Sequence, residues 1–207
     1  MIGKYVYGLL GHAAVYLALQ KAFGADRLRR LCVDILSPQA QERILDIGCG
    51  PAYILDYMPS VTYHGFDTEY RYIKYAKRKY CDRALAQFYC GPFTEAHMEV
   101  LEPFDGIMCM GLLHHLPDDA CHDMLNLVRK ALKVGGRVVT LDPCFVHGQS
   151  AIARFVAAHD RGTFVRDEKG YLGIVQAHFA EVRHNIVHNI GRLPSTEIIM
   201  CLKRPRI

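Results

Sequence analysis

The residues best suited to chemistry lie in one short run, where a carboxylate precedes two closely spaced glycines. Asp46 belongs to an apolar stretch with the length of a buried strand, and Gly48-Cys49-Gly50 follows at once. Glycine allows positive φ and lets a ligand approach the backbone closely. A helix over 53–58 would point its N-terminus at the same turn, so bare amide groups there could face a nucleotide-type ligand. The alternative is a strand-to-helix turn that binds nothing.

Asp46 indicates which kind of ligand this turn would accept. Its carboxylate, two residues before the first glycine, would repel a pyrophosphate and attract a cationic group. S-adenosyl-L-methionine carries two such groups, an α-ammonium and a sulfonium. A dinucleotide fingerprint G-x-G-x-x-G would require a third glycine at position 53, where Tyr53 stands. The residues therefore favour S-adenosyl-L-methionine over NAD.

The same run resembles the first motif of class I S-adenosylmethionine-dependent methyltransferases, a hydrophobic residue followed by D/E-x-G-x-G-x-G, with Ala52 in place of the third glycine. The resemblance extends from about residue 40 to the C-terminus and includes the segments LHHL (113–116) and GGRVVTLDP (135–143). It points to small bacterial methyltransferases of the ubiquinone- and sterol-methyltransferase-like type. It implies S-adenosyl-L-methionine as the methyl donor and S-adenosyl-L-homocysteine as the product.

The ends of the second and third predicted strands supply the next candidates for cofactor binding. Asp67 follows the second strand and could accept hydrogen bonds from both ribose hydroxyls, although an N-cap role for the next helix is the alternative. Thr68 and Tyr72 would lie nearby, Tyr72 against the adenosine or simply packed. The full set that we expect around the adenosine is Asp67, Thr68, Tyr72, Cys90, Gly91, Pro92 and Phe93.

Cys90 departs from the family pattern, because methyltransferases of this kind usually place an acid there to bind the adenine amino group. A thiol is a poor acceptor, so backbone groups and stacking on Phe93 would hold the base instead. At the end of the fourth strand, Met110 and Gly111 would pass the methionine part of the cofactor.

The histidine pair after the fourth strand is the best candidate for a catalytic role. His114 could act as a base or hydrogen-bond partner near the methyl acceptor, whereas His115 would point inward and fix the loop. The alternative is that neither histidine touches substrate. Asp142 ends the fifth strand near the same place, and the tract 160–166 is typical of a substrate-side loop.

These residues require a particular scaffold. Strand signals at 43–47, 61–66, 86–90, 104–110 and 137–142 alternate with helix signals, and Gly135-Gly136 is expected to end the helix before the fifth strand. Two β-rich runs at 182–188 and 197–203 predict a hairpin. The expected fold class is α/β, a doubly wound, mostly parallel, seven-stranded Rossmann-like sheet with an antiparallel C-terminal strand.

Two domains are expected: an N-terminal helical lid over 1–36, carrying Tyr5, Tyr7 and His12, and a methyltransferase domain over 37–207. The lid role comes from the resemblance, and a plain packed helix is the alternative. The apolar stretch 5–20 is too short and too often interrupted for a membrane span, and no cleavage site follows it. We therefore expect no membrane insertion.

The amino-acid composition limits which kinds of binding partner are expected. A formal charge of +4 without an arginine-rich tract argues against nucleic acid, so a small-molecule acceptor is expected. Eight cysteines without a C-x-x-C pair predict free thiols and a reducing, cytoplasmic location. His114-His115 and the nearest cysteines lack the spacing of zinc ligands, so no metal is expected. A homodimer is compatible with the sequence.

The expected reaction is an SN2 transfer of a methyl group to an O, N, C or S nucleophile. The cofactor supplies the reactivity, and the protein aligns acceptor, methyl and sulfur while excluding water. Two alternatives stay open. One is an NAD(P)-dependent reductase, which Asp46 and Tyr53 disfavour. The other is a non-catalytic module that binds S-adenosyl-L-methionine, for which the departures at Ala52 and Cys90 leave room.

Overall fold

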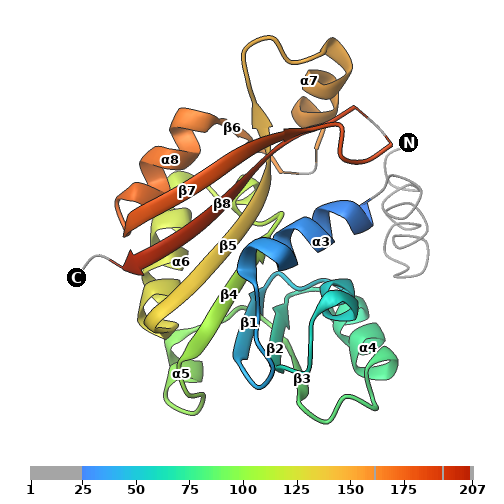
Figure 1. Ribbon diagram of the computed structural model, residues 1–207, viewed down its shortest axis with the longest axis vertical. Helices are drawn as coiled ribbons and strands as arrows, with labels where there is room; N and C mark the ends of the chain where they lie inside the picture. The colour runs from blue at the N-terminus through green and yellow to red at the C-terminus, as the bar shows by residue number, and fades with distance from the viewer. Residues whose placement is uncertain (1–24, 161, 193, 206–207) are drawn as a thin grey trace.

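A mostly parallel sheet with helices on both faces forms the body of the protein (Figure 1). The computed structural model describes residues 25–160, 162–192 and 194–205. The strands are β1 (Arg43–Ile47), β2 (Thr62–Asp67), β3 (Ala86–Cys90), β4 (Phe104–Met110), β5 (Leu132–Phe145), β6 (Arg166–Asp167), β7 (Phe179–His188) and β8 (Thr196–Pro205). The helices are α3 (Ala25–Leu36), η1 (Tyr53–Tyr57), α4 (Tyr70–Lys79), α5 (Glu95–Met98), η2 (Leu113–His115), α6 (Asp118–Ala131), α7 (Ala151–Ala158) and α8 (Glu168–Gln176).

The strand order is β3-β2-β1-β4-β5-β8-β7, and the short β6 pairs with β5 outside this path. Strands β1 to β5 are parallel, and β8 runs antiparallel to both β5 and β7. The expected fold class is therefore confirmed. The order reverses at β1, which pairs with β2 on one side and β4 on the other. Ligands of doubly wound sheets bind at such a switch point, beyond the carboxyl ends of the strands.

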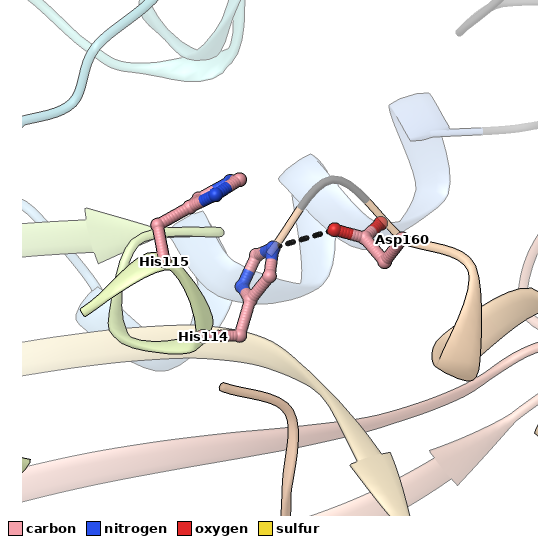
Figure 2. A group of neighbouring side chains, drawn as sticks. All are labelled: His114, His115 and Asp160. Atoms are coloured by element: carbon pink, nitrogen blue, oxygen red, sulfur yellow. Dashed lines mark ion pairs between the residues drawn. The ribbon is translucent and has the colours of Figure 1, made fainter. Parts of the chain in front are cut away.

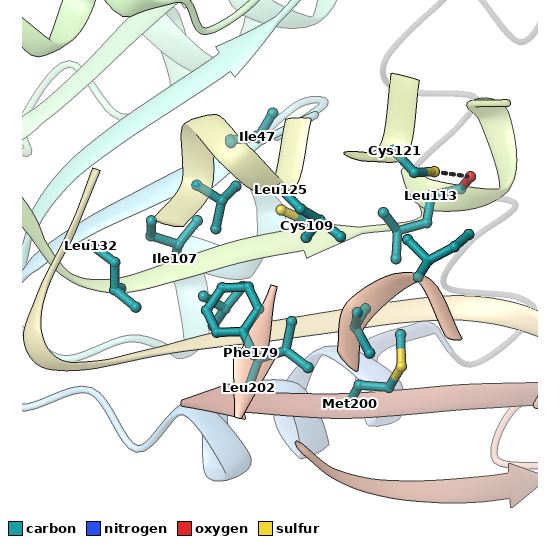
Figure 3. Close-up of a cluster of buried hydrophobic side chains, with 14 of the residues drawn as sticks. Ile47, Ile107, Cys109, Leu113, Cys121, Leu125, Leu132, Phe179, Met200 and Leu202 are labelled. Atoms are coloured by element: carbon teal, nitrogen blue, oxygen red, sulfur yellow. Dashed lines mark hydrogen bonds between the residues drawn. The ribbon is translucent and has the colours of Figure 1, made fainter. Parts of the chain in front are cut away.

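Each face of the sheet carries its own apolar core. On one face, α6 and α8 bury residues against β4, β5 and β8, and Figure 3 shows part of this cluster with Phe179, Met200 and Leu202 beneath α6. Cys121 also fixes the start of α6, because its Sγ lies 3.5 Å from Leu113 O. On the other face, α3, η1 and α4 pack over β1 and β2. Strand β1 is thus buried from both sides, as expected of a central parallel strand.

Most element bounds agree closely with the sequence prediction, and one local signal misleads. Gly135-Gly136 does not end the helix, because α6 stops at Ala131 and β5 begins at Leu132. The two glycines instead lie within β5, where the pairing with β4 shifts between Phe104 and Gly106. Gly135 has φ +80°, so glycine serves here as an irregularity in a strand rather than as a helix end.

The N-terminal region can be described only from residue 25. Helix α3 packs through Cys32, Val33 and Leu36, which are buried in the same core as β1 and η1. The predicted lid residues Tyr5, Tyr7 and His12 lie outside the described residues. Among the described helices, none is both long and apolar enough to cross a bilayer.

Candidate cofactor and acceptor site

The glycine turn after β1 satisfies its own amide groups. Gly48 N and Cys49 N both donate to Phe66 O, at 2.8 and 3.0 Å, and Ala52 N donates to Cys49 O. Gly50 N donates to Asp67 Oδ2 at 2.7 Å. The prediction of bare amide groups is therefore wrong, because β2 accepts from the amides of Gly48, Cys49 and Gly50, and the turn itself accepts from that of Ala52. The turn offers no nest for a phosphate, which agrees with the preference for a ligand that carries no pyrophosphate.

The segment after the turn is a 3₁₀ helix, η1, rather than the α-helix expected over 53–58. It spans only Tyr53–Tyr57, and no side chain caps its N-terminus. Ala52 precedes it with φ 57° and ψ 31°, a left-handed conformation that residues other than glycine adopt at a cost. Its methyl group is fully buried, so the position of the third glycine in the motif is both strained and packed here.

Ala52 therefore gives a first prediction. Ala52→Gly should change stability by no more than about 1 kcal/mol, because relief of the left-handed strain offsets the added chain entropy and the lost methyl contacts. Ala52→Val should lower the free energy of unfolding by about 2–4 kcal/mol, because a branched side chain meets both the strain and a filled core. Thermal unfolding of the two variants beside the parent measures the difference. Equal melting temperatures for Ala52→Val and the parent would contradict the assigned backbone.

Asp67 ends β2 directly beside the glycine turn. Its Oδ2 accepts from Gly50 N, and its Oδ1 accepts from Glu69 N at 2.8 Å. It is not an N-cap, since α4 begins at Tyr70 with Glu69 in the cap position. Each oxygen thus has one backbone donor and keeps a lone pair for a further donor. Burial raises the pKa of Asp67, and the two amide donors partly counter this effect.

Asp46 is buried at the end of β1, with 3% of its surface exposed. Tyr63 OH donates to Asp46 Oδ2 at 2.6 Å. Burial raises the pKa of Asp46 to about 7; the Tyr63 hydrogen bond acts in the opposite direction, and the charge of Asp67 adds to the increase. The sequence analysis missed Tyr63, because its pairing with β1 becomes visible only with the register of the parallel strands. A buried carboxyl with such a pKa gains from any cation that approaches it.

The segment after β3 presents backbone rather than side chains. An added Cβ on Gly91 or Gly50 would meet no atom within 4 Å, so both glycines border open space. Gly91 N donates to Asp67 O, which joins this segment to the end of β2. The Cys90 thiol is exposed. The Phe93 ring is only 5% exposed and packs edge-on against Phe66. The prediction that a base stacks on Phe93 is therefore wrong, because this ring is packed among other aromatic rings of the core.

The end of β4 adjoins the glycine turn from the other side. An added Cβ on Gly48 would contact the Leu112 side chain at 3.5 Å. Gly111 has φ +65°, and its Cβ position lies 3.7 Å from His114 Cε1. Met110 is half-buried just before it. The sheet thus brings the predicted methionine-side residues and the histidine pair to one edge.

His114 is a buried residue at the centre of a polar group that also contains the buried Asp142 and the exposed Asp160. Its Nδ1 lies 2.8 Å from Asp142 Oδ1. Its Nε2 faces Asp160, as Figure 2 shows, and lies 2.9 Å from Asp160 Oδ1. Burial by itself would lower the pKa of His114, but the hydrogen bonds to Asp142 and Asp160 outweigh it and raise the pKa to about 9. Both ring nitrogens are therefore occupied in this arrangement, and His114 has no free site from which to act as a base.

The predicted orientations of the two histidines are reversed. His114 is 4% exposed and points inward, whereas His115 is exposed. The reason is Asp142, which is fully buried in β5 and also accepts from the His114 backbone N at 3.1 Å. A buried carboxylate needs a hydrogen-bond donor, and His114 is the histidine that can reach Asp142. Which of two adjacent histidines points inward cannot be predicted from the sequence without knowing this partner.

The predicted substrate-side loop does lie against the histidine segment. Phe164 N donates to His114 O at 3.0 Å, and Gly162 packs so closely that an added Cβ would lie 2.0 Å from His114 Cδ2. Arg166 donates to Leu113 O and Leu116 O. We call residues 160–166 the strap; Arg161 within it lies outside the described residues. The strap joins two segments about fifty residues apart in sequence, which no local pattern could reveal.

Comparison with known proteins identifies the domain. A family model described as "Methyltransferase domain" matches residues 44–136, which include β1, the glycine turn, β4 and the histidine pair. Residues 44–136 therefore form a methyltransferase domain. The predicted family is confirmed, and S-adenosyl-L-methionine is the cofactor that belongs to it.

Two relatives of the methyltransferase domain have curated names. Both are called ubiquinone biosynthesis O-methyltransferase, one from Paracidovorax citrulli and one from Thiobacillus denitrificans. Each is 29% identical over 118 and 117 residues respectively, or 54% of this chain. The match covers 48% of each relative, so this chain spans about half the length of the curated relatives that it matches.

Solved structures share the fold of the methyltransferase domain at low identity. Phosphoethanolamine N-methyltransferase 2 of Haemonchus contortus, in complex with S-adenosyl-L-methionine, has a TM-score of 0.67 at 13% identity, covering 86% of this chain and 52% of that one. The [4+2]-cyclase SpnF has a TM-score of 0.63 at 17% identity, covering 87% and 81%. The fold therefore hosts more than one kind of reaction, and the reaction must be argued from the site.

Proposed function

We propose that this protein transfers a methyl group from S-adenosyl-L-methionine to a small-molecule acceptor. The observation that supports this most directly is Asp67, which lies beside open backbone at Gly50 and Gly91 with lone pairs to spare on both oxygens. Two vicinal ribose hydroxyls suit such a carboxylate. The satisfied amides of the glycine turn and the buried Asp46 then favour a cationic methionine group over a phosphate.

The remaining predicted contacts keep their places in this proposal. Asp46, Gly48, Cys49, Gly50, Met110 and Gly111 border the methionine part, and Asp67, Thr68, Tyr72, Cys90, Gly91, Pro92 and the Phe93 backbone border the nucleoside. When bound, S-adenosyl-L-methionine supplies an electrophilic methyl group. The protein holds the acceptor in line with that group, and alignment can supply as much as roughly 7–11 kcal/mol.

The histidine segment marks the acceptor side. In this proposal the exposed His115 contacts the acceptor, while His114 holds the segment through Asp142 and Asp160. This division of roles replaces the expectation of His114 as a base. It suits acceptors whose nucleophile needs no strong base, and a hydroxyl acceptor would require further activation at this edge.

Three binding measurements and one transfer measurement test the function. Calorimetry should show binding of S-adenosyl-L-methionine and S-adenosyl-L-homocysteine and none of NADH. Incubation of the protein with methyl-labelled cofactor and a metabolite extract should then label a small molecule. Binding of NADH in place of the two nucleosides would support the reductase alternative. Cofactor binding without any labelled product would support the non-catalytic module.

Asp46 gives a pH prediction for cofactor binding. The pKa of its carboxyl is about 7, so it is mostly neutral below pH 6 and mostly anionic above pH 8. If the cofactor ammonium binds the anion, affinity should rise about 25-fold between pH 5.5 and 7.5, because the charged fraction of a carboxyl with this pKa rises from about 3% to about 76%. Asp46→Asn should bind weakly and without this rise. A parent affinity that is flat over the same range would remove Asp46 from the ammonium site.

We also propose the binding partners and the cellular location of the protein. The acceptor is a small molecule, the chain binds no nucleic acid, and it works in the cytoplasm, which all eight thiols being free supports. A homodimer remains compatible with these features. Size-exclusion chromatography with light scattering measures the oligomeric state directly.

A further inference from the structure

The two histidines and the strap bring three metal-ligating side chains together. His114, His115 and Asp160 each offer one ligand atom, and these atoms all lie within 4.8 Å of one another. Figure 2 shows both histidines on one turn of chain, with Asp160 facing them from the neighbouring loop. Nitrogen and oxygen atoms bound to one first-row metal at about 2.1 Å lie roughly 3.0–3.4 Å apart. The His114 Nε2 to Asp160 Oδ1 distance of 2.9 Å is already close to this range.

We propose that His114 Nε2, His115 and a carboxylate oxygen of Asp160 form a site for one divalent transition-metal ion. The ion would take the place of the proton that His114 and Asp160 now share. His115 is exposed, and its ring centroid lies 4.1 Å from that of His114, so the two imidazoles lie together on this side of the strap. No metal was expected from the sequence, because the residues near His114-His115 lack the spacing of metal ligands. Asp160 lies forty-five residues downstream of His115, and only the fold brings it to the histidines.

Asp142 gives independent support for this assignment. A metal-binding histidine usually donates its second ring N–H to a carboxylate, which fixes the ring and makes the ligating nitrogen more basic. Asp142 Oδ1 lies 2.8 Å from His114 Nδ1, and Asp142 is completely buried. A carboxylate therefore already orients His114, with Nε2 turned toward Asp160, before any ion is considered.

The charge of this group, in which His114 and Asp142 are buried and Asp160 is exposed, favours a divalent ion. Two carboxylates, Asp142 and Asp160, face one imidazole, so even a protonated His114 leaves one negative charge uncompensated. Asp142 Oδ2 is buried and has no hydrogen-bond partner among the described residues. The guanidinium of Arg166 is engaged by Leu113 O, Leu116 O and Asp118. A divalent ion with a neutral His114 would balance both carboxylates.

The ligand set also selects the class of ion. Two imidazoles and one carboxylate suit Zn²⁺, Co²⁺, Ni²⁺ or Fe²⁺, whereas Mg²⁺ and Ca²⁺ prefer oxygen ligands. Three protein ligands leave at least one position open. Since His114 Cε1 lies 3.7 Å from the Cβ position of Gly111, this position adjoins the proposed acceptor side. An acceptor with an oxygen or nitrogen donor would fit there; this last step rests on the proposed function.

Cobalt absorption tests the site without reference to activity. Tag-free protein treated with a chelator and desalted should bind one Co²⁺ per chain, with visible absorption bands that Zn²⁺ abolishes and Mg²⁺ leaves unchanged. His115→Ala and Asp160→Asn should each weaken Co²⁺ binding at least tenfold. His115 is exposed, so His115→Ala should keep the parent melting temperature and carries the test if Asp160→Asn loosens the strap.

The matched control is His122→Ala, which removes a histidine from a separate pair with His178. It should bind Co²⁺ like the parent. Failure of the parent to bind Co²⁺, or loss of binding in His122→Ala with retention in His115→Ala, would overturn the site. Cofactor calorimetry on the same samples separates the two proposals. A chain that binds S-adenosyl-L-methionine but no Co²⁺ removes the metal site alone, and the reverse pattern removes the proposed function alone.

Discussion

Asp67→Ala is expected to weaken binding of S-adenosyl-L-methionine by at least about 100-fold. Hydrogen bonds to a charged group contribute roughly 1.5–3 kcal/mol each, and the variant would lose two of them to the ribose hydroxyls. It also removes the acceptor for Gly50 N, so the glycine turn would lose the bond that joins it to β2. Calorimetry with S-adenosyl-L-methionine and S-adenosyl-L-homocysteine measures the effect.

Two further variants make the Asp67 experiment specific. Asp67→Asn keeps one acceptor oxygen and should lose about tenfold in affinity, between the parent and the alanine variant. Asp82→Ala is the matched control, because Asp82 is exposed just before β3, at the opposite end of the strands from Asp67. It should bind like the parent. Parent-like affinity in Asp67→Ala, at an unchanged melting temperature, would place the ribose elsewhere.

Gly162→Ala is expected to detach the strap from the histidine segment. The new Cβ would lie 2.0 Å from His114 Cδ2 and 2.5 Å from His114 O. His114 cannot retreat, because Asp142 holds both its ring and its backbone N. The strap must therefore move, with loss of the contacts from Asp160 and Phe164. Overpacking of this kind costs about 1–3 kcal/mol, or roughly 2–12 °C in melting temperature for a chain of this size.

Hydrogen exchange over residues 158–166 gives the most direct reading of this variant. The Phe164 amide, which donates to His114 O, should exchange much faster in Gly162→Ala than in the parent. Gly173→Ala is the control, since an added Cβ there meets no atom within 4 Å and the residue lies in helix α8. It should leave the Phe164 amide protected. Equal protection of Phe164 in Gly162→Ala and the parent would show that the strap does not close against His114 in solution.

Local patterns predicted the scaffold well, because the scaffold is built from local rules. The bounds of β1, β3 and β4 agree with the sequence prediction residue for residue, since each is a short apolar run between clear breaks. The same logic found the glycine turn and Asp67. It misjudged Gly135-Gly136, because a glycine pair can mark an irregular strand as well as a helix end.

The polar contacts of the site escaped prediction, because each depends on how distant segments pair. Tyr63 reaches Asp46 only through the register of β1 and β2, and Asp142 decides which histidine turns inward. Asp160 joins the group through a strap whose path the sequence does not encode locally. The family assignment was within reach of the motif, while the roles of individual site residues stay predictions for the experiments above.

The position of β8 has a consequence for how the protein is made. β8 is the last strand in the sequence, yet it lies between β5 and β7 and pairs with both. On the ribosome, β5 and β7 are synthesised first, and each then exposes an unpaired edge, with Val138 and Val139 among the residues that wait for β8. Such edges recruit other chains. This half of the sheet can therefore be completed only after residues 196–205 have been synthesised, and until then the edges of β5 and β7 are open to pairing with other chains.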